Sequence, residues 1–152
     1  MDILTKVKMD HSNIHTLLKQ IISQIEMGNK TNGLLADLLE EVKEHFQAEK
    51  VCLSEMFLEE EKQHSSLQIN KDAVFKLLAD KAYQDLDKIS ENKELENQLH
   101  ALEKLLKEHS HYVEDIILHL CQECISDQKS EDLSLKFEQE KIKTLISGIS
   151  YA

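Results

Sequence analysis

The sequence contains no proline and only three glycines in 152 residues. Proline breaks a helix interior and glycine weakens one, so their scarcity permits long uninterrupted helices. Leucine, lysine, glutamate, glutamine and isoleucine are abundant instead. The composition therefore predicts an all-α protein, and the length is sufficient for one domain with a sizeable core.

Basic residues are also scarce, because 18 Lys and Arg stand against 29 Asp and Glu, for a formal net charge of -11. Binding to a phosphate backbone needs clustered basic residues, and their absence argues against nucleic acid as a partner. No stretch approaches the roughly 18 apolar residues of a membrane span, and residues 1–9 lack a continuous apolar segment. We expect no membrane association and a cytoplasmic location.

Only three cysteines are present, and an odd number argues against a disulfide framework in a chain of this length. Two of them, Cys121 and Cys124, form the segment CQEC at the end of a predicted helix. A single CxxC on a helix is weak evidence for a zinc or redox site. Cysteines packed at a helix interface are the favoured interpretation.

Apolar residues recur at helical spacing and predict four long helices, over about residues 3–27, 34–58, 64–84 and 93–125. Gly28 ends the first helix, and the acidic run 59–61 marks the end of the second. After a polar segment, Ser130 is expected to cap a short fifth helix. The prediction is an up-down-up-down antiparallel four-helix bundle over residues 1–126, with a C-terminal extension over residues 127–152.

Four histidines interrupt the apolar stripes of these helices: His15, His45, His64 and His109. Burying several imidazoles together is costly unless a partner such as a metal ion satisfies them. Glu49 follows His45 by four residues, which places the two about 40° apart around the helix and about 6 Å apart along it. Imidazole and carboxylate without thiolate suit iron, and to a lesser extent manganese or zinc.

His109 interrupts the stripe of the fourth helix, and Glu114 follows it by five residues, a turn of about 140°. Glu114 and Glu49 are therefore candidates to bridge two metal ions while His109 binds one of them terminally. The rival pair, His111 and Asp115, has the four-residue spacing. The rival pair lies on the polar face of the helix, so we favour His109 and Glu114 as the metal ligands.

The first and third helices offer further candidate ligands. Counting back from a turn near residue 30 puts His15 level with His45, and His11 level with Glu49. His15 is then the first choice, and His11 is a second ligand, a hydrogen-bond donor to a ligand, or a core histidine near the N-terminus. His64 lies level with Glu49 across a short turn and is the candidate from the third helix.

In order, the motifs "DHSNIHTLL", "EHFQAEK", a lone histidine and "LLKEHSHYVE" resemble the hemerythrin family, also called the HHE cation-binding domain. The resemblance covers roughly residues 8–121. It implies a four-helix bundle that holds a non-haem di-iron centre with an oxo or hydroxo bridge. In the family's opening motif the histidine after aspartate is often the ligand, which favours His11 over His15.

The resemblance also implies a function, which is to bind or sense a small diatomic, O2 or NO, or to handle iron. Oxygen carriers of the family have HxxxH on the third helix, whereas this chain has Gln68 four residues after His64. Because that ligand is missing, the sequence argues against a reversible oxygen carrier. The longer stretch from His64 to His109 is closer to the bacterial branch linked to nitric oxide, oxygen sensing and iron handling.

A ferritin-like di-iron carboxylate oxidase is the competing interpretation. Such enzymes use two ExxH motifs, and this chain has one at Glu61 and His64 and another at Glu108 and His111. The first helix would have to add Glu26. A histidine-rich site favours binding a diatomic over oxidising a substrate, so we expect a binding protein rather than an enzyme. The sequence indicates no protein partner.

Overall fold

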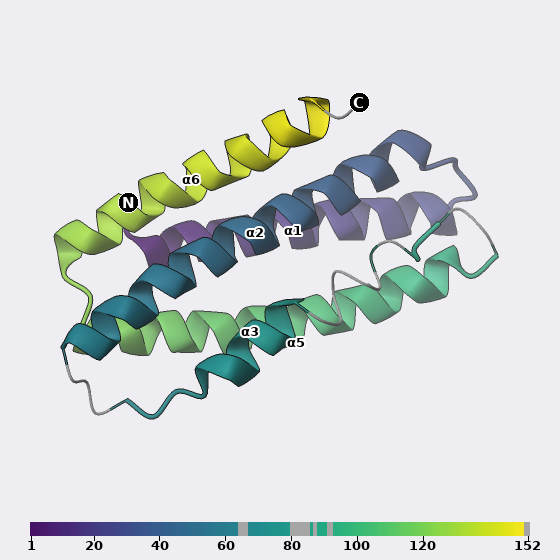
Figure 1. Cartoon of the computed structure of the whole chain (residues 1–152). Coiled ribbons are helices and arrows are strands. Elements are labelled where there is room, and N and C mark those ends of the chain that lie inside the picture. The colour runs from purple at the N-terminus through teal and green to yellow at the C-terminus, as the bar shows by residue number, and fades with distance from the viewer. Residues whose placement is uncertain (64–66, 80–85, 87, 91–92, 151–152) are drawn as a thin grey trace.

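A computed structural model describes residues 1–63, 67–79, 86, 88–90 and 93–150 of the chain (Figure 1). Its helices are α1 (Ile3–Glu26), α2 (Asn32–Lys62), α3 (Lys71–Ala79), α5 (Leu95–Glu123) and α6 (Asp127–Ser150). The described residues include no strand. No described helix combines the length and the apolar character that a membrane crossing requires.

The four long helices α1, α2, α5 and α6 pack antiparallel to their main neighbours (Figure 1). Helix α1 packs against α5 and α2, and α2 packs against α6 on its other side. The short helix α3 packs against α2. Each long helix buries one stripe of its surface, and the largest fully buried side chains come from all four: Ile3, Leu18, Ile21, Leu38, Phe46, Leu53, Met56, Leu99, Ile117 and Phe137.

The prediction of an all-α bundle of long antiparallel helices is confirmed, but the short helix is a different one. The C-terminal helix α6 has 24 residues, as many as α1. It is long because Leu133 and Phe137 are buried on the bundle, so tertiary packing stabilises the whole segment. The third predicted helix is represented by α3, and residues 64–66 and 80–84 of that prediction lie outside the described residues.

Two predicted helix boundaries are corrected. The acidic run 59–61 belongs to α2, because Lys71 lies 2.8 Å from Glu60 and 2.9 Å from Glu61 and offsets their charge. The N-terminus of α6 is capped by Ser126, whose hydroxyl accepts a hydrogen bond from the backbone N–H of Lys129 at 3.1 Å. Ser130 instead lies buried inside α6 and accepts from the backbone N–H of Ile3 at 2.9 Å.

Gly28 ends α1 as predicted, in a left-handed conformation with φ +77°. The backbone N–H groups of Gly28 and Asn29 donate to the carbonyls of Ile25 and Gln24, both at 2.9 Å. These two bonds satisfy carbonyls that the helix end would leave open, in a Schellman motif. The turn leads directly into α2 and so sets how α1 and α2 face each other.

We expect Gly28→Ala to lower the free energy of unfolding by about 1 to 2 kcal/mol, because an alanine disfavours the left-handed conformation. Gly33 is the matched control, since it lies in α2 with a right-handed backbone and no atom within 4 Å of an added Cβ. Gly33→Ala should raise stability by about 0.5 kcal/mol. Denaturant unfolding of both variants checks this, and equal effects would contradict it.

Candidate metal centre

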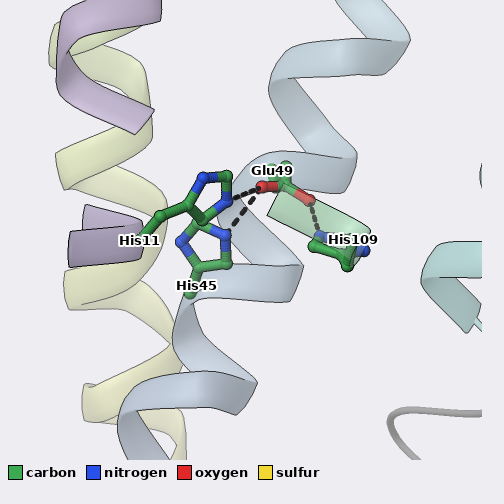
Figure 2. Close-up of side chains that lie close together, drawn as sticks. All are labelled: His11, His45, Glu49 and His109. Atoms are coloured by element: carbon green, nitrogen blue, oxygen red, sulfur yellow. Dashed lines mark hydrogen bonds and ion pairs between the residues drawn. The ribbon is translucent and has the colours of Figure 1, made fainter. Parts of the chain in front are cut away.

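Three histidines and one glutamate from three helices meet inside the bundle (Figure 2). Helix α1 supplies His11, α2 supplies His45 and Glu49, and α5 supplies His109. One potential ligand atom from each residue lies within 4.8 Å of all the others. Because the four side chains are at most 8% exposed, the cluster is shielded from bulk solvent.

Glu49 is the centre of this cluster, and its side chain is 0% exposed. Its Oε2 lies 2.7 Å from His45 Nε2 and 3.1 Å from His11 Nε2. Its Oε1 lies 2.6 Å from His109 Nε2. The two carboxylate oxygens thus face different histidines, as the dashed lines in Figure 2 show.

The outer nitrogens of two of these rings contact carboxylates. His45 Nδ1 lies 2.6 Å from Asp10 Oδ2, and His11 Nδ1 lies 2.8 Å from Glu114 Oε2. A carboxylate on the outer nitrogen fixes the tautomer and orientation of an imidazole, and it makes the inner nitrogen a better metal ligand. In both rings the nitrogen that faces Glu49 is Nε2.

The charges in the cluster shift one another's pKa values. Burial alone raises the pKa of Glu49, but the neighbouring His109 and His45 outweigh burial and hold that pKa well below its ordinary value. Burial lowers the pKa of His45, whereas the charge of Glu49 and the hydrogen bond to Asp10 raise it, to about 9 overall. Without a metal ion, His45 therefore carries a proton and balances the charge of the buried carboxylate.

The donor set is chemically suited to a metal ion. His45 Nε2 is buried and has no well-directed hydrogen bond, although it lies 2.7 Å from Glu49. Buried nitrogens without such a bond are rare in proteins. A divalent ion would take the place of the proton on His45, because metal ligands must be deprotonated. Three imidazoles and a carboxylate suit iron, manganese or zinc, so the residues fit a metal ion.

A pocket of about 320 Å³ reaches the cluster from the side where α1 and α5 face each other. Its walls include three of the cluster histidines, His11, His45 and His109. Nearer the surface the lining includes Ser12, His15, Lys107, Ser110 and His111. A molecule of a few atoms can therefore approach the cluster without opening the bundle.

The structure places the predicted site residues of α1 and α2 as follows. His45 and Glu49 lie together in the cluster, as their four-residue spacing predicts. His11 joins them, and its ring centroid lies 4.6 Å from that of His45. His15 was preferred when residues were counted back from the turn near residue 30. It lies one turn further along α1 and lines the pocket. His11 faces α2 because it lies between Val7 and Ile14 on the buried stripe.

Of the remaining candidates, His109 is buried in the cluster and His111 is exposed, so the apolar stripe decides the rotation of α5. Glu114 contacts the outer nitrogen of His11 rather than lying beside Glu49. Asp115 is exposed and lies 3.7 Å from His119. His64 lies outside the described residues.

The ExxH motifs do not form a second cluster among the residues described. Glu108 and His111 both lie on the exposed face of α5, and Glu61 is exposed on α2. Glu26 is exposed as well, at the opposite end of α1 from His11. The carboxylate-rich core that a ferritin-like oxidase needs is therefore not built from these glutamates.

The cysteines take no part in the described cluster. All three are free, and burial raises the pKa of Cys52 to about 12 and that of Cys121 to about 11. The Cys124 thiol donates a hydrogen bond to the carbonyl of Leu120 at 3.4 Å. Thiols with such high pKa values are poor metal ligands and poor nucleophiles, which agrees with a packing role.

Sequence reasoning missed Asp10 and Lys141. Asp10 lies on the buried stripe of α1 between Val7 and Ile14, which is the same signal that singled out the histidines. Lys141 lies one turn after the buried Phe137 on α6, and its ammonium donates to Asp10 Oδ1 at 2.7 Å. Lys141 gave no signal in the sequence, because its partner Asp10 lies on another helix 131 residues away.

Comparisons with protein-family models, with curated proteins and with solved structures find no match for this chain. The resemblance to hemerythrins therefore rests on the order and spacing of the residues themselves. What the structure adds is an all-helical bundle with a buried cluster of histidine and glutamate.

The burial of His109 and the exposure of His111 predict different results for the two alanine variants. His109→Ala should lose most bound metal, because it removes a nitrogen 2.6 Å from Glu49. His111→Ala should keep its metal and change the free energy of unfolding by about 0.5 kcal/mol or less, as exposed substitutions usually do. Elemental analysis and thermal unfolding of both variants test this. The reverse order of metal loss would contradict the orientation of α5.

Proposed function

We propose that this protein binds non-haem iron between α1, α2 and α5, and that the adjoining pocket admits a small diatomic, O2 or NO. The observation that carries the proposal is the buried group of His11, His45, Glu49 and His109 around one carboxylate. The proposal assigns these four residues as ligands. It assigns Asp10 and Glu114 to the outer nitrogens of His45 and His11.

Iron is favoured among the metals that this donor set suits. Zinc sites that only stabilise a fold are closed by four ligands, often thiolates, and do not need a path to solvent. Here the described ligands contain no thiolate, and a pocket leads to them. When bound, ferrous iron supplies electrons and an exchangeable coordination position, which O2 and NO both require.

Two iron ions per chain are proposed because of how Glu49 is placed. One of its oxygens faces His11 and His45, and the other faces His109. A carboxylate in that position can bridge two ions, as in sites whose metals lie about 3.5 to 4 Å apart. Further ligands for a second ion must come from neighbouring groups, and Glu114 is a candidate because it contacts His11 and lines the pocket.

The chain's own residues would prepare the site for a small neutral ligand. Asp10 and Glu114 hold the rings of His45 and His11, so little rearrangement is needed when a ligand arrives. Phe46 packs on His109, with ring centroids 4.9 Å apart, and Phe137 packs on His45 at 5.6 Å. Phe46 also lines the pocket, so the pocket reaches the cluster beside an aromatic side chain.

The proposal is tested by loading the metal-free protein with Fe(II) under anaerobic conditions. We expect about two iron ions per chain, and the addition of NO should produce new visible absorption bands that the zinc-loaded protein lacks. His45→Ala and Glu49→Ala should each lose most of the iron. They should also lose the stabilisation that bound metal contributes, about 2.7 kcal/mol at a hundredfold excess over Kd.

His119→Ala is the matched control, since His119 is exposed on α5 and hydrogen-bonds only its own helix among the contacts described. It should bind as much iron as the unchanged protein. Equal iron in the control, in His45→Ala and in Glu49→Ala would refute the site. One iron ion per chain instead of two would retain the site and refute its dinuclear form.

A further inference from the structure

The C-terminal helix α6 contributes no residue to the cluster but is connected to it by a chain of short contacts. Lys141 on α6 donates to Asp10 Oδ1 at 2.7 Å. The other oxygen of Asp10 lies 2.6 Å from His45 Nδ1. One carboxylate therefore joins an ammonium from α6 to a histidine whose opposite nitrogen faces Glu49.

All three members of this chain are largely removed from solvent. The side chains of Lys141, Asp10 and His45 are 13%, 5% and 1% exposed. An ion pair in this setting is little screened, and removal of one member leaves a buried charge without its partner. Asp10 without Lys141 would keep its contact with His45 through Oδ2 but lose the partner of Oδ1, so its carboxylate would be held less firmly.

Other ion pairs between α6 and α2 do not lead to the cluster. Lys136 pairs with Glu55, and Glu55 has no described contact with a cluster residue. Lys141 itself has a second partner, Glu41 at 2.8 Å, which is one third exposed. An ion pair with Glu41 alone would be enough to hold α6 against α2. The contact with Asp10 is the one that connects Lys141 to the cluster.

Resting on the proposed metal site, we propose that Lys141 is a positioning residue through which α6 determines how tightly the centre holds its metal. Its ammonium holds the Asp10 carboxylate in the orientation that fixes the ring of His45. Phe137, one helical turn before Lys141, packs against the same ring at 5.6 Å. Helix α6 therefore constrains His45 both through the packing of Phe137 against its ring and through its outer nitrogen.

The test compares variants that differ in this one connection. Lys141→Met removes the ammonium and keeps most of the side-chain length, Lys141→Arg restores a charge, and Lys136→Met removes the ion pair that does not reach Asp10. Each purified full chain is loaded with Fe(II) anaerobically, and the rate of release to a colorimetric chelator is measured. Thermal unfolding of the metal-free proteins shows how much stability each variant has lost.

Lys141→Met should release iron about tenfold faster, at the low end of the effect of changing an outer partner of a metal ligand. Lys141→Arg should recover most of that loss, and Lys136→Met should stay within about twofold of the unchanged protein. Release from Lys141→Met at the original rate would overturn the proposal. So would equal acceleration in Lys136→Met, because any loosening of α6 would then suffice.

A double-mutant cycle separates positioning from general stability. On an Asp10→Asn background, adding Lys141→Met should not accelerate release further, because Lys141 acts through the Asp10 carboxylate. Additive effects would overturn the proposal. This comparison also serves if Lys141→Met alone does not fold, since the double variant lacks the uncompensated charge. If the unchanged protein binds no iron, the proposed function itself fails. If it binds iron but Lys141→Met releases the iron at the original rate, only the role of Lys141 fails.

Discussion

Glu49 carries a negative charge at a place with no solvent contact, and the surrounding structure compensates for that charge. Burying an unpaired carboxylate costs several kcal/mol, and nitrogen atoms of three imidazoles within hydrogen-bond distance of Glu49 offset that cost. The three rings come from α1, α2 and α5, so the site exists only when these helices are packed. Folding and assembly of the cluster are consequently coupled here.

Two of the rings that face Glu49 are also contacted on their outer nitrogens. Asp10 and Glu114 contact the outer nitrogens of His45 and His11, while Phe46 and Phe137 pack on the rings. Carboxylates and imidazoles therefore alternate outward from Glu49. Beyond Asp10 the alternation ends with the ammonium of Lys141. The pocket between α1 and α5 leaves the cluster open to small molecules on one side.

Local signals in the sequence were sufficient to predict much of this site. The spacing of His45 and Glu49 placed them on one face of a helix, and the apolar stripe of α5 selected His109 over His111. These predictions are reliable because the two residues of each pair lie on the same helix. The 3.6-residue period of that helix fixes the direction of one side chain relative to the other. The all-α class followed in the same way from composition and periodicity, and so did the stop of α1 at Gly28.

Relations between helices had to come from the tertiary structure. Level counting along the hairpin preferred His15 over His11, an error of one helical turn, because the way two helices cross depends on the packing of all their side chains. The length of α6 and the contact of Lys141 with Asp10 depend on a helix that meets its partners only after the chain has folded back. Periodicity within a helix is local, so the sequence alone determined which face is buried. Only the assembled bundle decided which buried residues meet.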